Sequence, residues 1–339
     1  MTMSSKLSCV SLYTGIGGLD FGFEATGFAT RVAVELDRHA CENLRENQSW
    51  KVIEDDINRV DSATIRRTAE LDEEAPDVLI GGPPCQPFSK SGYWARGDSL
   101  RLDDPRADTL ANYLRVVRDL QPRAFLIENV AGLVFKNKDE GLQLILNTIN
   151  QINAETGSRY RPAVQVLNMA NFGVPQVRER VFIVASRNGE FFKFPRETHA
   201  ANPGGMDLLT EPCLPIHNSA YDALADLPEP NDVSALRVGG KWGDLLPSIP
   251  EGYNYLWHTD RNAGMPLFGW RTRYWSFLLK LSKRMPSWTI QAQPGSAVGP
   301  FHWKNRKLTF EEMCRLQTFP DGLVCSAGRT EMQRMVGNA

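Results

Sequence analysis

Residues 81–89 present one thiol on a stiffened loop, in the sequence Gly-Gly-Pro-Pro-Cys-Gln-Pro-Phe-Ser. A structural cysteine normally sits inside an apolar strand or helix, whereas Cys85 follows two prolines on a predicted loop. A thiol presented in this way can react as the thiolate nucleophile of a covalent mechanism. The loop contains no His, so a protease dyad is not indicated. The pattern predicts that Cys85 is a nucleophile, with a cysteine placed in a turn by chance as the alternative.

A carboxylate follows a short apolar run further along the chain. Glu128 comes directly after Phe125–Ile127 and is followed by Asn129 and Val130. Apolar neighbours partly desolvate a carboxylate, which raises its pKa and lets it donate a proton near neutral pH. Glu128 is therefore predicted to be a proton donor, with a helix-cap or turn carboxylate as the alternative.

Two arginines precede a predicted strand at Val181–Ala185. The alternation of an extended chain places Gln176, Arg178 and Arg180 on one face. A guanidinium group can donate to a base carbonyl or to a phosphate. The pattern predicts a polar ligand-binding face, and the alternative is a surface strand edge.

A glycine-rich loop indicates a site for a cofactor that carries a nucleoside. Tyr13 is followed by Thr-Gly-Ile-Gly-Gly-Leu-Asp, and glycines between a strand and a helix let the backbone approach a ligand. The dinucleotide fingerprint is not met because position 20 is Asp, so NAD is not favoured. Glu35 follows Gly15 by 20 residues, at the end of the next strand, where a carboxylate can bind ribose hydroxyls. A plain tight turn is the alternative.

Alternating strands and helices through the first 190 residues must position these groups. Short apolar runs predict strands at 7–13, 31–35, 77–80, 124–127, 163–167 and 181–185. Helical spacing is found at 19–25, 39–47 and 109–120. This alternation predicts an α/β fold with a doubly wound, mostly parallel sheet. Because ligands bind at the carboxyl ends of such strands, we expect one shared edge for the polar groups at 13–18, 35–37, 56, 81–86 and 128–129.

A second, smaller and irregular domain is predicted after residue 186, where Pro and Gly become frequent and helical periodicity is lost. Residues 261–307 contain nine basic and eight aromatic residues and no acid. Such a segment predicts a surface that contacts phosphates and bases, with a solvated basic face over a Trp-rich core as the alternative. A helix is predicted at Leu308–Leu316, opened by a capping box of Thr309 and Glu312.

Composition excludes several classes of protein. The 339 residues carry a net charge of −2 with 42% hydrophobic and 23% charged residues, as in ordinary soluble proteins. No apolar run reaches the roughly 18 residues of a membrane span, and the first nine residues do not form a signal peptide. The six Cys have no paired spacing, which argues against disulfides and a Cys-rich zinc site and for a reduced, cytoplasmic location.

Taken in order, these motifs resemble the DNA (cytosine-5-)-methyltransferase family. The motifs that carry the resemblance are the loop from Tyr13, Glu35, Asp56-Ile57, Pro-Cys-Gln at 84–86, Glu-Asn-Val at 128–130, Gln-x-Arg-x-Arg at 176–180, Leu308 to Pro320, and Val336 to Ala339. The resemblance implies the α/β fold of the methyltransferases that use S-adenosylmethionine. It also implies a catalytic and cofactor-binding domain at 1–186, a target-recognition domain at 187–305, and a return segment at 306–339 that packs on the catalytic domain.

The resemblance implies methyl transfer from S-adenosyl-L-methionine to carbon 5 of a specific cytosine in double-stranded DNA, in restriction-modification or phage defence. Cys85 would add to carbon 6 of a flipped-out cytosine, and Glu128 would hydrogen-bond or protonate ring nitrogen 3. Arg178 and Arg180 would bind the ring carbonyl oxygen and a phosphate, with Arg180 the first choice for the carbonyl.

The same resemblance assigns residues to the cofactor and to DNA. The cofactor-binding residues would be Tyr13, Gly15, Gly17, Gly18, Glu35, Leu36, Asp56 (or Asp55), Ile57, Pro83, Leu110 and Asn338. The DNA-binding residues would be Gln86, Ser89, Ser91, Arg271 and Arg273. The polar stretch 92–106 is expected to be a loop that closes over the flipped base.

The sequence departs from the family at three places, one of which is Asp55, where the family has Gly before the acid that precedes Ile57. The aromatic residue of the glycine-rich loop is commonly Phe, and here it is Tyr13. The family continues after Gly337-Asn338-Ala339 with a further helix, so we expect either a truncated chain or a second polypeptide that supplies this helix. The alternatives are an RNA cytosine methyltransferase and a DNA-binding subunit active only with a second chain. A nicotinamide dehydrogenase leaves Cys85 unexplained.

Overall fold

The chain folds into two compact units in a computed structural model, which describes residues 6–84, 108–135, 140–201, 214–240, 242–293, 295 and 297–339. The first unit comprises Met1–Leu167 and Glu179–Pro195, and the second comprises Asn168–Arg178 and Arg196–Ala339. This division groups 306–339 with the second unit. The functional division at 1–186, 187–305 and 306–339 stays a prediction.

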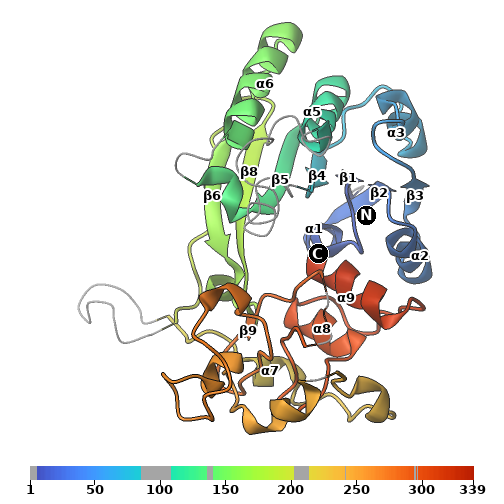
Figure 1. The fold of residues 1–339 in the computed structure, drawn as a ribbon. Coiled ribbons are helices and arrows are strands. Elements are labelled where there is room, and N and C mark those ends of the chain that lie inside the picture. Colours follow the sequence, from blue (N-terminus) through green and yellow to red (C-terminus); the bar gives the residue numbers. More distant parts are fainter. Residues whose placement is uncertain are drawn as a thin grey trace. The chain divides into compact units, whose positions relative to one another are not determined.

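A seven-stranded sheet is the centre of the first unit (Figure 1). Its strands in spatial order are β3 (Lys51–Glu54), β2 (Phe28–Glu35), β1 (Leu7–Leu12), β4 (Val78–Gly81), β5 (Ala124–Val130), β8 (Glu179–Ser186) and β6 (Ala163–Asn168). The five strands from β3 to β5 pair in parallel, and β5 pairs with β8 in antiparallel fashion. The expected α/β fold with a mostly parallel sheet is confirmed.

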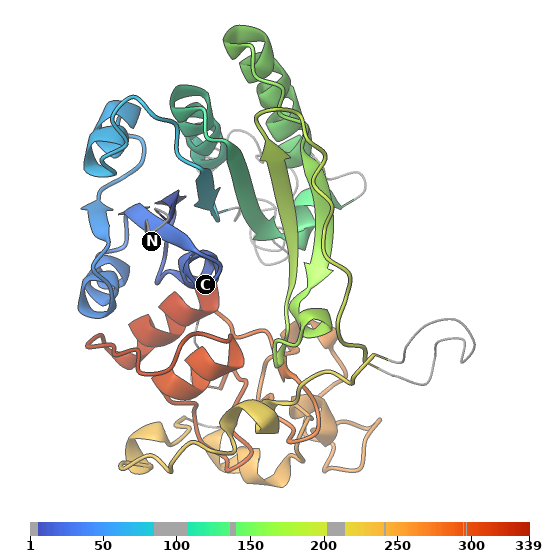
Figure 2. The same cartoon turned by 180° about the vertical axis from the view of Figure 1, so that it is seen from behind.

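Helices connect the strands and cover both faces of the sheet, which Figure 2 shows from behind. Val10 and Leu79 belong to one apolar cluster, whereas their chain neighbours Cys9 and Ile80 belong to another. Because side chains alternate along a strand, the two clusters lie on opposite faces, so the sheet is buried on both sides. The helices are α1 (Gly18–Ala25), α2 (Arg38–Asn47), α3 (Ser62–Thr68), α5 (Asp108–Leu120) and α6 (Glu140–Thr156), and a 3-10 turn spans Ala131–Val134.

The second unit is built mainly of turns, as the loss of periodicity predicted. Its regular elements are β7 (Gln176–Val177), α7 (Ala220–Leu224), β9 (Ser287–Trp288), α8 (Phe310–Leu316) and α9 (Arg329–Asn338). Its 3-10 turns span Met169–Phe172, Ser234–Leu236, Gly243–Ser248, Tyr255–His258 and Thr272–Tyr274. Thr309 caps α8 together with Glu312, so the predicted capping box is confirmed.

An aromatic cluster stabilises this irregular unit. The rings of Trp242, Tyr255, Phe268 and Phe277 meet edge to face with centroids 5.2 to 6.2 Å apart. Such contacts are a favourable geometry for aromatic pairs and add to the burial of large apolar surfaces. The core of this unit is therefore aromatic rather than Trp-rich, because Trp242 is only partly buried and Trp270 and Trp275 are exposed.

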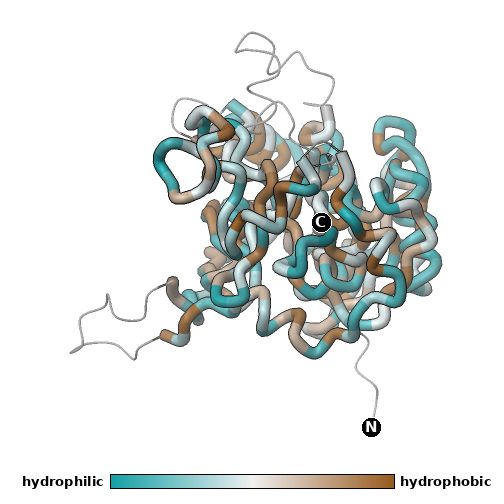
Figure 3. Tube along the Cα trace, turned by 60° about the horizontal axis from the view of Figure 1, so that its bottom comes forward, coloured by the Kyte–Doolittle hydropathy of each residue, from teal (hydrophilic) through white to brown (hydrophobic). Residues whose placement is uncertain are grey.

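Hydrophilic and hydrophobic residues are interspersed along the chain (Figure 3). Within the described residues, no helix is long and apolar enough to cross a membrane.

Candidate active site

The strand register brings most of the predicted chemistry to one edge of the sheet. Leu12 pairs with Val34 on one side and with Gly81 on the other, and Gly81 pairs with Ile127. The residues that follow in each parallel strand therefore form the next row, at the carboxyl edge where ligands bind. That row consists of Glu35, Tyr13, Gly82 and Glu128.

Glu35 holds the glycine-rich loop in place. Its Oε2 accepts a hydrogen bond from the Gly15 backbone N–H at 2.7 Å, and its Oε1 accepts one from the Asp37 N–H at 2.8 Å. Burial raises the pKa of this carboxyl group above its ordinary value. Each carboxylate oxygen has a second lone pair, so Glu35 has the acceptor capacity for a ligand hydroxyl. Leu36, which follows it, is 64% exposed.

The turn that follows β1 requires glycine at one position. Gly17 has a φ of 85°, and a Cβ there would lie 2.8 Å from the Trp50 ring. Gly15 also has a positive φ, of 57°, but faces open space. Gly18 begins α1, and Asp20 in its first turn accepts hydrogen bonds from the hydroxyls of Ser11 and Thr30. The Asp that breaks the dinucleotide fingerprint thus ties α1 to two strands.

Tyr13 lies against apolar side chains. The Tyr13 side chain packs against the core cluster that contains Ile57, which is 6% exposed, and Leu110, which is 1% exposed. Asp56 lies beside this cluster, and its Oδ1 accepts hydrogen bonds from the Asn58 backbone N–H and Nδ2 at 2.9 Å each. These contacts are suited to an apolar ring with polar groups at its rim.

Glu128 and Arg180 form an ion pair beside Gly82. The Arg180 Nε lies 2.7 Å from the Glu128 Oε1, and the two side chains are 16% and 22% exposed. The antiparallel register pairs Arg180 with Val130, two residues from Glu128, so both side chains lie on the same face. A Cβ at position 82 would lie 3.0 Å from the Glu128 Oε2, so the carboxylate sits directly against Gly82.

Arg178 serves a different purpose from Arg180. It is 6% exposed, and its Nη2 donates to the Gly337 carbonyl at 3.4 Å and to the Ala339 carbonyl, at the end of α9. The expected single extended segment is wrong, because β7 ends at Val177 and pairs with β9, whereas β8 begins at Glu179 in the large sheet. Gln176 is fully buried, and its amide has no hydrogen-bond partner within the described part of the chain.

Three side chains that were not predicted to be site residues hold the site's backbone. Arg115 on α5 donates from Nη2 to the Ile57 and Val60 carbonyls at 2.9 and 3.0 Å. Asn129 donates to the Pro83 carbonyl, and Thr109 donates to the Pro84 carbonyl. Asn129 follows Glu128 in the recognised motif, but no signal in the sequence marks Thr109 or Arg115.

The remaining candidates lie elsewhere in the chain. Arg271 and Arg273 are both exposed. Arg271 precedes the 3-10 turn Thr272–Tyr274 and Arg273 lies within it, with its guanidinium 5.8 Å from the Tyr274 ring centre. Asn338 is the last residue of α9, and its assignment to the cofactor stays a prediction. Cys85, Gln86, Ser89, Ser91 and the stretch 92–106 fall outside the described residues.

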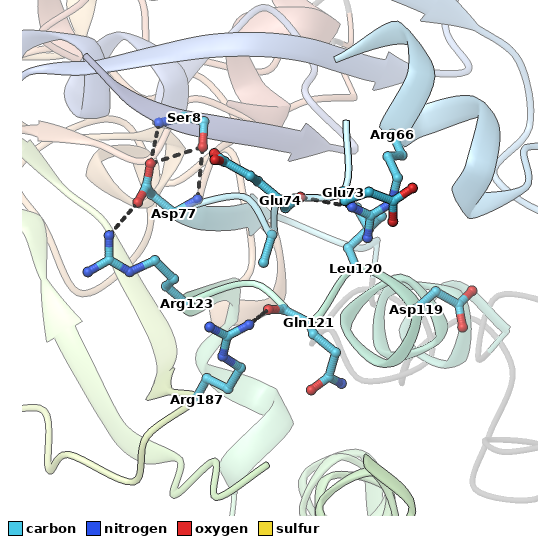
Figure 4. Close-up of a pocket in the computed structure, with 11 residues that line it drawn as sticks. Ser8, Arg66, Glu73, Glu74, Asp77, Asp119, Leu120, Gln121, Arg123 and Arg187 are labelled. Carbon is cyan, nitrogen blue, oxygen red and sulfur yellow. Dashed lines mark hydrogen bonds and ion pairs between the residues drawn. The ribbon is translucent and has the colours of Figure 1, made fainter. Parts of the chain in front are cut away.

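A polar hollow of about 460 Å³ lies at the opposite edge of the same sheet (Figure 4). Its lining includes Asp77 and Arg123, which come directly before β4 and β5 and form an ion pair at 2.8 Å. Ligands of parallel sheets bind at the carboxyl ends, so this hollow at the strand starts is not the candidate site. No group of three or more metal-ligating side chains was found in the described ranges.

Residues 7–339 match the family model described as C-5 cytosine-specific DNA methylase. The Type II methyltransferase M.SacI of Streptomyces achromogenes is 38% identical, with 99% of this chain and 90% of that protein covered. M.NgoFVII of Neisseria gonorrhoeae is 33% identical, with 99% and 83% covered. The crystal structure of S. pombe Dnmt2 methyltransferase shares the fold, with a TM-score of 0.61, 17% identity, and 98% and 93% of the chains covered. These comparisons do not support a second polypeptide.

Proposed function

The chain belongs to the C-5 cytosine-specific DNA methylase family and is a DNA (cytosine-5-)-methyltransferase, and we propose that the carboxyl edge of its sheet is the active site. The family match confirms the resemblance found in the ordered motifs. The observation that carries the proposal is the register row. In this row Glu35 ends β2, Tyr13 follows β1, Gly82 follows β4 and Glu128 lies on β5, and these four strands are neighbours in that order. A donor site and a proton-transfer site are thereby adjacent.

The residues at this edge fit S-adenosyl-L-methionine, whose use the family implies. Glu35 would bind the ribose hydroxyls, Ile57 and Asp56 would flank the adenine, and Tyr13 would pack on its other side. Gly15 has a left-handed backbone and faces open space, which leaves the loop accessible to a ligand, and Gly17 lets the same loop turn against Trp50. Leu36, Gly18, Pro83, Leu110 and Asn338 complete the proposed set. When bound, the sulfonium centre supplies an electrophilic methyl group.

Cys85 performs nucleophilic catalysis in this proposal. Carbon 5 of cytosine is a poor nucleophile while the ring is aromatic, and addition of the thiolate to carbon 6 produces a nucleophilic enamine. Carbon 5 would then form its bond to the methyl group as the methyl–sulfur bond of the donor breaks, which leaves S-adenosyl-L-homocysteine. Loss of the carbon 5 proton restores the double bond and expels the Cys85 thiolate.

Glu128 and Arg180 act on the polar edge of the cytosine. Glu128 shares or donates a proton at ring nitrogen 3, which stabilises negative charge as the thiolate adds. Arg180 donates to the ring carbonyl oxygen and orients the carboxylate through its Nε, at 2.7 Å. The bonds that Arg178 makes to α9 support a role in holding the chain that leads into β8, so Arg180 is the stronger candidate for the carbonyl.

The second unit reads the DNA in this proposal. Arg271 and Arg273 contact phosphates, and the exposed rings of Trp270, Tyr274 and Trp275 accompany them on the same segment. A stacked cytosine cannot reach a thiol, so the nucleotide is flipped out of the duplex at a cost of a few kcal/mol. Gln86, Ser89 and Ser91 are the proposed DNA contacts of the catalytic loop.

A role in restriction-modification follows from the relatives, which are named Type II methyltransferases. The proposed enzyme protects its host's DNA by methylating a specific sequence. The RNA alternative is not favoured, because the matching family acts on DNA.

Incubation of the chain with plasmid DNA and methyl-labelled S-adenosyl-L-methionine, followed by bisulfite sequencing, tests the proposal. We expect label in DNA and one methylated sequence context, with Cys85→Ser as the inactive control. Label in carbon 5 with full activity of Cys85→Ser would exclude the covalent mechanism, and no label with any DNA would exclude the proposed activity of this chain.

A further inference from the structure

The backbone directly before Cys85 is held through two proline carbonyls. Pro83 and Pro84 have no N–H, so hydrogen bonds can anchor them only through their carbonyl oxygens. The Asn129 Nδ2 donates to the Pro83 carbonyl at 2.9 Å, and the Thr109 Oγ1 donates to the Pro84 carbonyl at 3.1 Å. The residue that precedes Cys85 is therefore attached to the first turn of α5.

The same threonine is attached to the glycine-rich loop. The Tyr13 hydroxyl donates to the Thr109 carbonyl oxygen at 2.7 Å. Burial raises the pKa of this phenol above its ordinary value, so the hydroxyl keeps its proton and stays a donor. Tyr13 has a φ of 54°, which is uncommon for a residue other than glycine, so its ring direction is tied to the turn that opens the loop.

These hydrogen bonds form one continuous path between the glycine-rich loop after β1 and the loop after β4. Thr109 accepts through its backbone carbonyl and donates through its side chain, so these two bonds link the Tyr13 hydroxyl to the Pro84 carbonyl through the first turn of α5. Tyr13 lies at the end of β1 and Pro84 follows β4, which is the neighbouring strand. The path therefore crosses from the proposed cofactor loop to the loop of the proposed nucleophile.

We propose that Tyr13 and Thr109 are positioning residues that couple occupancy of the cofactor loop to the placement of Cys85. The inference rests on the proposed function, because it takes the glycine-rich loop as the donor site and Cys85 as the nucleophile. The hydroxyls of Tyr13 and Thr109 both donate to backbone carbonyls, so both side chains act on the backbone of the site. Their contribution is to the geometry of the bound state.

Four variants separate this role from a general effect on folding. Tyr13→Phe removes only the donor hydroxyl, and Thr109→Val removes the second link with little change of shape. Thr109→Ser retains a hydroxyl and is the conservative rescue. Tyr160→Phe is the matched control, because the Tyr160 hydroxyl donates to the Pro122 carbonyl at 2.6 Å within the same unit, away from the site edge.

Steady-state methyl transfer is the first measurement. We expect Tyr13→Phe and Thr109→Val each to lower kcat about 5- to 20-fold, as the loss of one or two positioning bonds predicts. Affinity for S-adenosyl-L-homocysteine should stay within about threefold, and Thr109→Ser and Tyr160→Phe should resemble wild type. The kcat of the double variant should be no lower than that of the less active single variant, because both substitutions interrupt the same chain of hydrogen bonds. Wild-type kcat in Tyr13→Phe and Thr109→Val would overturn the proposal, as would a loss explained by weaker S-adenosyl-L-homocysteine binding alone.

Alkylation of Cys85 by iodoacetamide is the second measurement and needs no turnover. Peptide mass spectrometry gives the rate at this thiol with and without S-adenosyl-L-homocysteine. We expect the ligand to change the rate in wild type and in Thr109→Ser, and to have no effect in Tyr13→Phe and Thr109→Val. An equal response in all four proteins, or none in wild type, would refute the coupling. If wild type transfers no methyl group, the proposed function fails, whereas this comparison still decides the coupling.

Discussion

Two Arg–Glu pairs, one in each unit, differ in what they leave accessible. Arg180 and Glu128 meet at the carboxyl edge of the large sheet and remain 16% and 22% exposed. Arg306 and Glu312 are 4% and 5% exposed, and both guanidinium Nη atoms bond the carboxylate, at 2.6 and 2.8 Å. The same type of ion pair thus stays partly accessible in the proposed active site, whereas in the irregular second unit it is buried and supports packing.

The two units also differ in how they position their polar side chains. In the first unit, strand register positions polar side chains at an edge, and the core lies behind them. In the second unit, aromatic contacts and buried polar groups replace the ladder. Charged side chains at the edge of the regular sheet stay partly accessible, whereas charged side chains inside the irregular unit are buried and stabilise its fold.

Replacing Glu128 is the largest expected test of this contrast. Glu128→Gln keeps the shape but removes the carboxylate, and we expect kcat to fall about 10²- to 10⁴-fold, the range of general acid–base catalysis. The urea midpoint of unfolding should hardly change, because the pair is partly exposed. Single-turnover methyl transfer and urea titration measure the two effects. A large loss of stability with little loss of rate would assign this pair to the fold.

Glu312→Gln should have the opposite outcome. It leaves the Arg306 guanidinium buried without its counter-charge, and removing one partner of a buried pair costs about 3–5 kcal/mol. Six of the eight Trp follow residue 240, so fluorescence during urea unfolding reports mainly on the second unit. The matched control is Glu229→Gln, which breaks an exposed pair with Lys304 and should leave the urea midpoint nearly unchanged. Equal midpoints for the two variants would contradict the structural role of Arg306 and Glu312.

Asp20 extends the comparison to a buried carboxyl group for which no ion pair is found within the described residues. It is 1% exposed, and burial raises its pKa from 3.8 to about 7. The folded state therefore binds more protons than the unfolded state between these values. The resulting stability is fully present below pH 4 and is lost as the pH rises through 7.

Asp20→Asn should remove this pH dependence. The variant should match wild type near pH 4 and be more stable above pH 7, by up to about 4 kcal/mol. Urea unfolding at several pH values measures the difference. A constant difference from pH 4 to pH 9 would show that the Asp20 carboxyl titrates alike in the folded and unfolded chain.

The contrast also explains how far the sequence could predict the structure. The apolar runs predicted β1, β2, β4, β5, β6 and β8, and parallel strands necessarily bring their carboxyl ends to one edge. They did not predict β3, whose ends Lys51 and Glu54 are exposed and whose middle is only half-buried. The site row of Glu35, Tyr13, Gly82 and Glu128 followed from this regularity.

Long-range hydrogen bonds account for what the sequence did not predict. Arg178 and Arg180 are equivalent in the motif, yet one bonds carbonyls 159 and 161 residues away and the other bonds Glu128. Thr109 and Arg115 act on backbone carbonyls, which carry no residue-specific signal. Such pairings depend on the tertiary structure, so a motif can identify a site residue without identifying its hydrogen-bond partner.

The smallest expected effect concerns the exposed arginines of the second unit. Arg271→Ala and Arg273→Ala should each weaken DNA binding about 3- to 10-fold and reduce the salt slope by about one, because each contact with a phosphate releases counterions. Arg67→Ala removes an exposed guanidinium from α3 of the first unit and is the matched control. Fluorescence anisotropy across a range of salt concentrations measures affinity and slope together. If the slope is unchanged in both second-unit variants, their charge is solvated surface, and the second unit binds DNA through other residues.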